Sequence, residues 1–138
     1  MLECMILGDS IAKGVGMVRQ DCMTFAASGI NSQNYVKQYV DVVDTYKIKT
    51  AIISLGANDY ETLPTEHYLT QLRSSIDAQR VFWIVPNNHD RTARQDVINI
   101  AKRYGDFIID TRKHELSPDK VHPTGNGYRD IAAETRGQ

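Results

Sequence analysis

Short apolar runs alternate with longer amphipathic stretches along the whole chain. Five of these runs are predicted to be buried strands: Cys4 to Leu7, Met23 to Ala27, Ala51 to Leu55, Val81 to Val85 and Phe107 to Ile109. Their residues are mostly β-branched or otherwise apolar, which is typical of short strands covered on both faces. The alternation is that of βαβ units, so the sequence predicts an α/β fold with a mainly parallel sheet.

The stretches between the predicted strands have the spacing of helices. Apolar residues recur at three- and four-residue steps within Asn34 to Tyr46, Glu66 to Ala78 and Asp90 to Tyr104, and Gly127 to Thr135 offers a shorter helix. That spacing is typical of helices with one face on a core. No repeat or linker interrupts the 138 residues, so a single domain is predicted over 1–138.

Composition narrows the class of protein. With 41% hydrophobic and 24% charged residues the chain is an ordinary globular protein, and a net charge of -1 favours no nucleic-acid partner. Its apolar runs are far shorter than the ~20 residues of a membrane-spanning helix. The N-terminus enters the first strand without a basic leader or a long apolar region, which predicts a cytoplasmic chain or one without a signal peptide of its own.

The two cysteines, Cys4 and Cys22, have neither metal-ligand spacing nor the density of a disulfide scaffold. They are therefore predicted to be reduced, packed thiols. A disulfide is the alternative, available if the first two strands lie side by side.

Three short motifs follow predicted strands, at the edge where a parallel sheet presents its ligand site. Gly8-Asp9-Ser10 can expose a serine hydroxyl on a tight turn, and the alternative is the N-cap of a helix. Gly29 can present its amide to a negative oxygen, and otherwise it marks a turn. Asn58 can aim its side-chain amide at an oxyanion, and otherwise it is a turn asparagine.

A fourth motif, Asp119-Lys120-Val121-His122, lies after the last predicted strand and before the last helix. Three-residue spacing on a loop can bring the Asp119 carboxylate back to the His122 imidazole. Such a contact fixes the tautomer of the ring and stabilises the imidazolium that forms when the ring takes a proton from serine.

In this order the four motifs resemble those of the SGNH hydrolases, also called GDSL esterases and lipases. The matching residues are Gly8-Asp9-Ser10-Ile11, Gly29, Gly56-Ala57-Asn58-Asp59 and Asp119-Lys120-Val121-His122. The resemblance runs over most of the chain. It implies a three-layer α/β/α sandwich around a five-stranded parallel sheet of the flavodoxin-like kind.

The resemblance also implies a site and a reaction. Ser10 is the nucleophile, His122 the general base and Asp119 the residue that orients His122. The amides of Ser10 and Gly29 and the Asn58 side chain form an oxyanion hole. The implied activity is hydrolysis of small acyl esters, including O-acetyl esters on carbohydrates, without a metal or an organic cofactor.

Other candidates remain open at this stage. Asp9, Tyr60 and His89 are candidate substrate contacts, although Tyr60 is equally suited to pack on its own loop and His89 to cap the next helix. Alternative functions are a non-catalytic module that binds a glycan or a protein, and a short-chain thioesterase or lysophospholipase. A flavin or nucleotide binder is disfavoured, because the glycines after Ser10 lack the order of a phosphate-binding loop.

Overall fold

The computed structural model describes residues 1–87 and 91–137. Its centre is one sheet of five strands, β1 (Leu2–Gly8), β2 (Met23–Ala26), β3 (Lys47–Ser54), β4 (Asp77–Val85) and β5 (Phe107–Asp110). Each neighbouring pair is parallel, in the order β2-β1-β3-β4-β5. The five predicted strands and the flavodoxin-like order are therefore confirmed.

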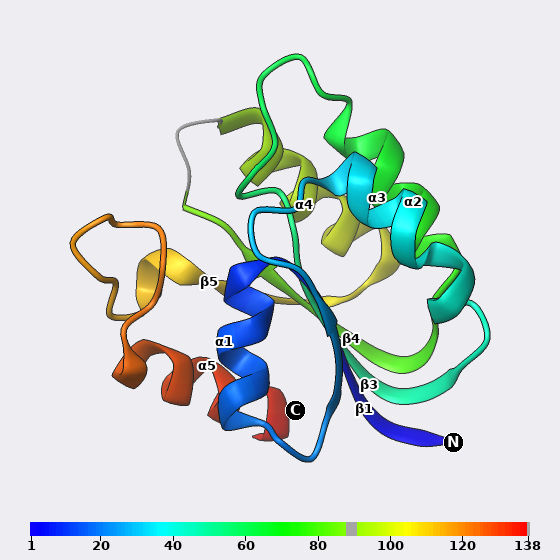
Figure 1. The fold of residues 1–138 in the computed structure, drawn as a ribbon, viewed down its shortest axis with the longest axis horizontal. Helices are drawn as coiled ribbons and strands as arrows, with labels where there is room; N and C mark the ends of the chain where they lie inside the picture. The colour runs from blue at the N-terminus through cyan, green and yellow to red at the C-terminus, as the bar shows by residue number, and fades with distance from the viewer. Residues whose placement is uncertain (88–90, 138) are drawn as a thin grey trace.

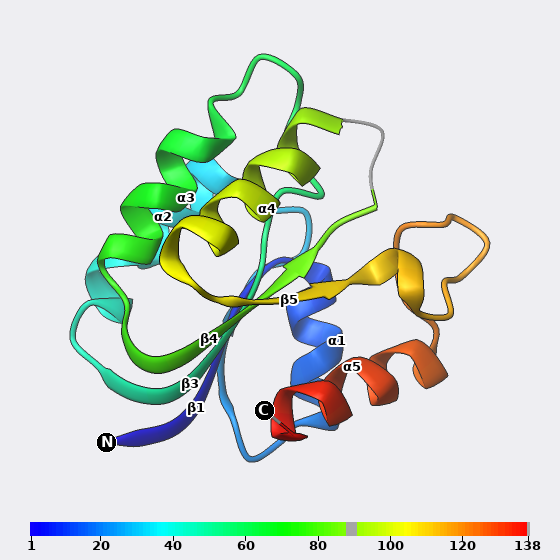
Figure 2. The ribbon, with the colours of Figure 1, turned by 180° about the vertical axis from the view of Figure 1, so that it is seen from behind.

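Helices cover both faces of the sheet, which gives the predicted three layers (Figures 1 and 2). On one face lie α1 (Ser10–Val18) and α5 (Gly125–Gly137), and on the other α2 (Ser32–Val43), α3 (Thr65–Ser74) and α4 (Arg91–Tyr104). A 3-10 turn, η1 (Thr111–Lys113), follows β5. In the described part of the chain no helix is long and apolar enough to cross a membrane.

The structure contains a helix, α1, that the apolar spacing of the sequence did not predict. Two glycines within it, Gly14 and Gly16, lower its helix propensity. The structure gives a packing reason for both, because a Cβ on Gly14 would lie 2.2 Å from the Tyr128 ring and one on Gly16 would lie 2.7 Å from the Thr24 hydroxyl. The glycines allow α1 to approach α5 and β2 closely.

The helix predicted from Glu66 to Ala78 is too long. Helix α3 ends at Ser74, and Ala78 already belongs to β4. The apolar spacing continues through Ile76, which is buried with the same core as α3 although it lies in the connection. The burial of Ile76 in the connection thus made the apolar spacing, and the helix predicted from it, longer than α3.

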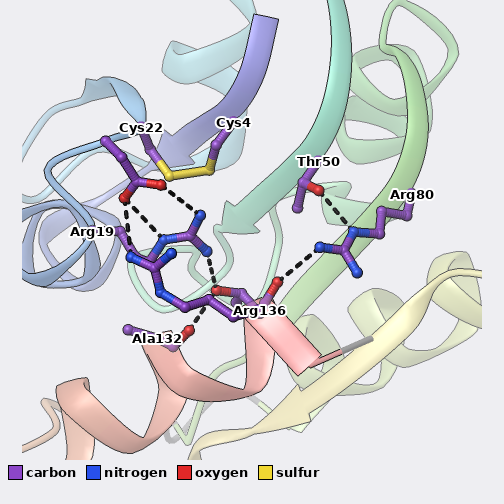
Figure 3. Close-up of a disulfide and its surroundings, with 9 residues drawn as sticks. Cys4, Arg19, Cys22, Thr50, Arg80, Ala132 and Arg136 are labelled. Atoms are coloured by element: carbon purple, nitrogen blue, oxygen red, sulfur yellow. Dashed lines mark hydrogen bonds and ion pairs between the residues drawn. A yellow bond between two sulfur atoms is a disulfide. The ribbon is translucent and has the colours of Figure 1, made fainter.

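Cys4 and Cys22 form a disulfide, so the prediction of two reduced thiols is wrong (Figure 3). Their Cα atoms are 4.6 Å apart. The cause is the pairing of β1 with β2, in which Met5 lies opposite Met23, because each cysteine directly precedes one of these two residues. The alternative that the sequence left open is the one that the strand order selects.

We predict that the double variant Cys4→Ala/Cys22→Ala lowers the free energy of unfolding by about 3 kcal/mol, because the bond closes a short loop in the unfolded chain. Urea unfolding measures the change. Wild type treated with a thiol reductant is the control and should lose a similar amount. A loss below about 1 kcal/mol in both samples would contradict the prediction.

Candidate active site

The turn between β1 and α1 places Ser10 at the carboxyl edge of the sheet. Gly8 has a φ of +142°, and a Cβ on it would lie 1.9 Å from the Ser54 carbonyl oxygen of β3. The Asp9 N–H donates to that same oxygen at 3.0 Å. Ser10 is the first residue of α1 and is half-buried. The predicted tight turn and its alternative, a helix start, are thus both present.

Asp9, a candidate substrate contact from the sequence, is fully buried in this structure and caps α1. Its Oδ1 accepts from the N–H groups of Ile11 (3.0 Å) and Ala12 (3.4 Å) and from the Ser54 hydroxyl (3.1 Å). Within the described residues no group donates to its Oδ2. Burial raises the pKa of Asp9 to about 6, although these hydrogen bonds lower it.

Ser10, His122 and Asp119 form a continuous hydrogen-bonded chain. The Ser10 hydroxyl lies 2.9 Å from His122 Nε2, and His122 Nδ1 lies 2.6 Å from Asp119 Oδ2. A carboxylate only accepts hydrogen bonds, so Nδ1 carries the ring proton and Nε2 faces the serine as an acceptor. The structure therefore brings together the three residues that the motifs proposed, although Ser10 and His122 are 112 residues apart in the sequence.

The Asp119 carboxylate also shapes the backbone of its own loop. Its Oδ1 accepts from the N–H groups of Val121 at 2.9 Å and His122 at 3.0 Å. These two backbone hydrogen bonds, followed by the bond from the His122 ring, hold the pKa of Asp119 well below its usual range. One carboxylate thus orients both the imidazole and the peptide that carries it.

Within the described residues, the groups predicted to form the oxyanion hole have hydrogens available for donation. Over residues 1–87 and 91–137, no group accepts from the backbone N–H of Ser10 or of Gly29, which has a φ of +77°. The Asn58 side chain is exposed and donates one hydrogen of its Nδ2 to the Ile30 carbonyl at 3.1 Å. That bond fixes Asn58 one residue from Gly29 and leaves its second amide hydrogen available.

Asp59, the last residue of the Gly56-Ala57-Asn58-Asp59 motif, was not singled out from the sequence as a site residue. It is buried, and its carboxylate accepts from the Ser32 N–H at 2.8 Å and from the Thr65 hydroxyl at 2.6 Å. It therefore ties the start of α2 to the segment between β3 and α3, which fixes the loops of Gly29 and Asn58. Its place beside Asn58 in the motif was the available signal.

The remaining candidates have different surroundings. Tyr60 is 54% exposed, which leaves its ring accessible, and His89 lies outside the described residues.

Tyr128, which the sequence did not single out, lies over Gly14 of α1. Burial, with the charges of two nearby aspartates, raises the pKa of Tyr128 to about 12. In residues 1–87 and 91–137, no three His, Cys, Asp or Glu side chains gather in a way that could hold a metal ion.

Comparison with known proteins gives a fold assignment. No model of a protein family matches the sequence, and no curated protein matches it. Solved structures do match. A GDSL-like lipase from Bacteroides thetaiotaomicron is 16% identical, with a TM-score of 0.66 over 96% of this chain and 84% of the lipase.

Two further solved structures have the same architecture. The acetylxylan esterase Axe2 from Geobacillus stearothermophilus is 19% identical, with a TM-score of 0.67 over 99% of this chain and 94% of the esterase. The α/β hydrolase LAE5 from the metagenome of Lake Arreo is 17% identical, with a TM-score of 0.67 over 97% and 94% of the two chains. The chain thus has the SGNH-hydrolase fold that its motifs implied.

We predict that Asp9→Asn changes the pH dependence of stability. Because the pKa of Asp9 is raised in the folded state, its contribution to stability is present at low pH and is lost as the pH rises through about 6. Asparagine caps helices equally well and does not titrate. The stability of the variant relative to wild type should therefore increase by about 2 kcal/mol from pH 4 to pH 7.

Urea unfolding at a series of pH values gives this difference. Asp41→Asn, which removes an exposed carboxylate on α2, is the matched control and should follow wild type. A difference between Asp9→Asn and wild type that stays constant from pH 4 to pH 7 would contradict the prediction.

Proposed function

We propose that this chain is a serine esterase of the SGNH family, with Ser10 as nucleophile, His122 as general base and Asp119 orienting His122. The observation that carries the proposal is the hydrogen-bonded chain from the Ser10 hydroxyl through both ring nitrogens of His122 to Asp119. The SGNH fold and the four motifs in their order support it. A tautomer fixed by a carboxylate is what a general base needs to accept a proton from serine.

In the acylation step the Ser10 Oγ attacks the carbonyl carbon of the ester. A carbon–oxygen bond forms, and the hydroxyl proton passes to His122 Nε2. The imidazolium then gives this proton to the oxygen of the leaving alcohol as the ester bond breaks. Asp119 remains ionised throughout, in keeping with the lowered pKa of its carboxyl. In the second step His122 takes a proton from water, whose oxygen attacks the carbonyl carbon of the acyl-enzyme. The bond from that carbon to Ser10 Oγ then breaks, Oγ takes the proton back from the imidazolium, and the acid is released.

The negative oxygen of each tetrahedral intermediate needs fixed donors. The proposed donors are the N–H groups of Ser10 and Gly29 and the Nδ2 of Asn58. The bond from Asn58 to the Ile30 carbonyl supports this role, because a held amide needs no reorganisation when charge develops on the oxygen. Asp59 is a positioning residue, because its bonds to Ser32 and Thr65 fix the loops that carry the Gly29 N–H and the Asn58 amide.

For the substrate we propose a small acyl ester, with an O-acetyl group on a carbohydrate as the leading candidate. One similar structure is an acetylxylan esterase. Three connections at the proposed site are short: one residue between β1 and α1, five residues at 27–31 and ten at 55–64. Segments of this length offer little wall for a long acyl chain. Short thioesters and lysophospholipids are the alternative substrates, and a binding module without turnover is the alternative function.

The compartment in which the protein works is a separate part of the proposal. Disulfides persist in oxidising surroundings and are rare in the reducing cytosol. The bond between Cys4 and Cys22 therefore favours an oxidising compartment over the cytoplasmic location that the N-terminal sequence predicted.

We predict that a fluorophosphonate probe labels Ser10, and that Ser10→Ala removes the label and lowers turnover by several orders of magnitude. Mass spectrometry of the labelled peptide and hydrolysis of p-nitrophenyl acetate measure the two effects. Ser28→Ala, which truncates another exposed serine after a strand, is the control. Absence of label in folded wild type would favour the binding module.

We also predict that catalytic efficiency is greatest for acetyl or similarly short acyl groups. Burial of each further methylene would contribute about 0.8 kcal/mol only if an apolar wall existed to receive it. Efficiency is measured on p-nitrophenyl esters from acetate to palmitate at constant detergent. A maximum for medium or long acyl chains would contradict the prediction and favour lipid esters.

A further inference from the structure

Lys120 has a backbone conformation that lysine rarely adopts. Its φ is +61°. Among residues 1–87 and 91–137, every other residue with a positive φ is a glycine. It lies between Asp119 and His122, in the loop that carries both. The left-handed conformation is unfavourable for a residue with a Cβ, so other contacts must stabilise it at this position.

Hydrogen bonds inside the loop depend on this conformation. The Lys120 N–H donates to the Ser117 carbonyl at 2.8 Å, and the Ser117 N–H and hydroxyl donate to the His122 carbonyl at 2.8 and 2.6 Å. Asp119 Oδ1 closes the same turn by accepting from Val121 and His122. A change of conformation at Lys120 would therefore reorient the His122 peptide and, with it, the imidazole.

Asn87, directly after Pro86 at the end of β4, contacts the Lys120 peptide from outside the loop. Its Nδ2 donates to the Lys120 carbonyl at 2.7 Å, and its Oδ1 accepts from Arg112 Nε at 2.8 Å. A guanidinium only donates and a carbonyl only accepts, so these two partners together dictate how the amide is turned. Asn87 itself is half-buried, and both of its hydrogen bonds lie at the surface of the molecule.

The other side of this contact is anchored in the sheet. The Arg112 N–H donates to Asp110 Oδ1 at 3.0 Å, and Asp110, the last residue of β5, binds both terminal nitrogens of Arg94 at 2.9 and 2.6 Å. The Arg94 guanidinium holds the pKa of Asp110 below its usual range, so the pair stays ionised. Hydrogen bonds therefore connect α4 and β5 to Arg112 through Asp110, and the Arg112 side chain continues the connection to Asn87.

We propose that Asn87 is a positioning residue that holds Lys120 in the left-handed conformation and thereby places His122 and Asp119 against Ser10. Arg112 fixes the orientation of the Asn87 amide. This inference rests on the proposed function, because it assigns Asn87 a role in the activation of Ser10. Asn87 acts through the Lys120 backbone and takes no part in bond formation.

The first test is Asn87→Ala. Loss of the bond to the Lys120 carbonyl should reduce the population of the competent loop, and therefore kcat and the rate of fluorophosphonate labelling, by roughly 5- to 30-fold. The KM should stay within about twofold, because the loss falls on the activation of Ser10. Asn99→Ala is the matched control, since it removes an exposed asparagine amide bonded to Gln95 on α4.

The second test is rescue through the backbone. In the Asn87→Ala background, Lys120→Gly should restore most of the lost rate, because glycine adopts a positive φ without a steric penalty. Lys120→Ala in the same background removes the same side chain but keeps the Cβ, and it should restore nothing. This comparison separates a role in loop conformation from loss of stability elsewhere.

The third measurement does not depend on turnover. The proton on His122 Nδ1 that is bonded to Asp119 should give a downfield NMR resonance in wild type and Asn99→Ala. The resonance should be broadened or lost in Asn87→Ala and recovered with Lys120→Gly. An unchanged resonance and unchanged kcat in folded Asn87→Ala, or a loss that Lys120→Gly does not relieve, would overturn the inference. Absence of Ser10 labelling in wild type with these NMR changes intact would instead reject the proposed function alone.

Discussion

The burial of Asp9 between β1 and α1 is the constraint on which the proposed site depends. Its N–H donates to the Ser54 carbonyl of β3, and its carboxylate caps the helix that begins at Ser10. Gly8 lets the chain approach β3 so closely that a Cβ would collide with the Ser54 carbonyl. A strand, a helix and the neighbouring strand are joined at one point, and the position of Ser10 follows from that junction.

Two carboxylates near Ser10 have opposite environments. Asp9 is buried, one of its oxygens has no hydrogen-bond partner among the described residues, and its pKa is raised. Asp119 lies on an exposed loop, and backbone donors lower its pKa. The difference suits their positions, because the buried acid holds a helix in place whereas the exposed one must remain charged beside the imidazole.

The two ends of the sheet have different kinds of support. At the amino end, the disulfide closes a ring from Cys4 to Cys22 that contains the whole of α1 and therefore Ser10. At the carboxyl end, polar side chains connect the loops: Asp59 joins two of them and Asn87 joins a third to the sheet. The polar contacts act on the loops, where no regular hydrogen-bond ladder fixes the backbone.

Much of the architecture follows from the sequence by itself. Apolar runs at the spacing of strands and helices determined the five strands and the two-sided cover, because the hydrophobic pattern is set locally. The motifs that follow the strands identified the candidate site residues, which are Ser10, Gly29, Asn58, Asp119 and His122. For the turn at Asp9 and Ser10 the sequence offered both outcomes, whereas for the cysteines it favoured reduced thiols over the disulfide that forms.

The tertiary structure decided what depends on contacts between distant segments. Strand register determined the disulfide, since the pairing of Met5 with Met23 brings the residues directly before them, Cys4 and Cys22, together. Close helix packing explained the glycines of α1, which local propensity had counted against a helix. Asn87 lies 33 residues from Lys120, so its bond to the loop has no signal in periodicity or spacing. Such contacts exist only once the sheet has brought the ends of its strands together.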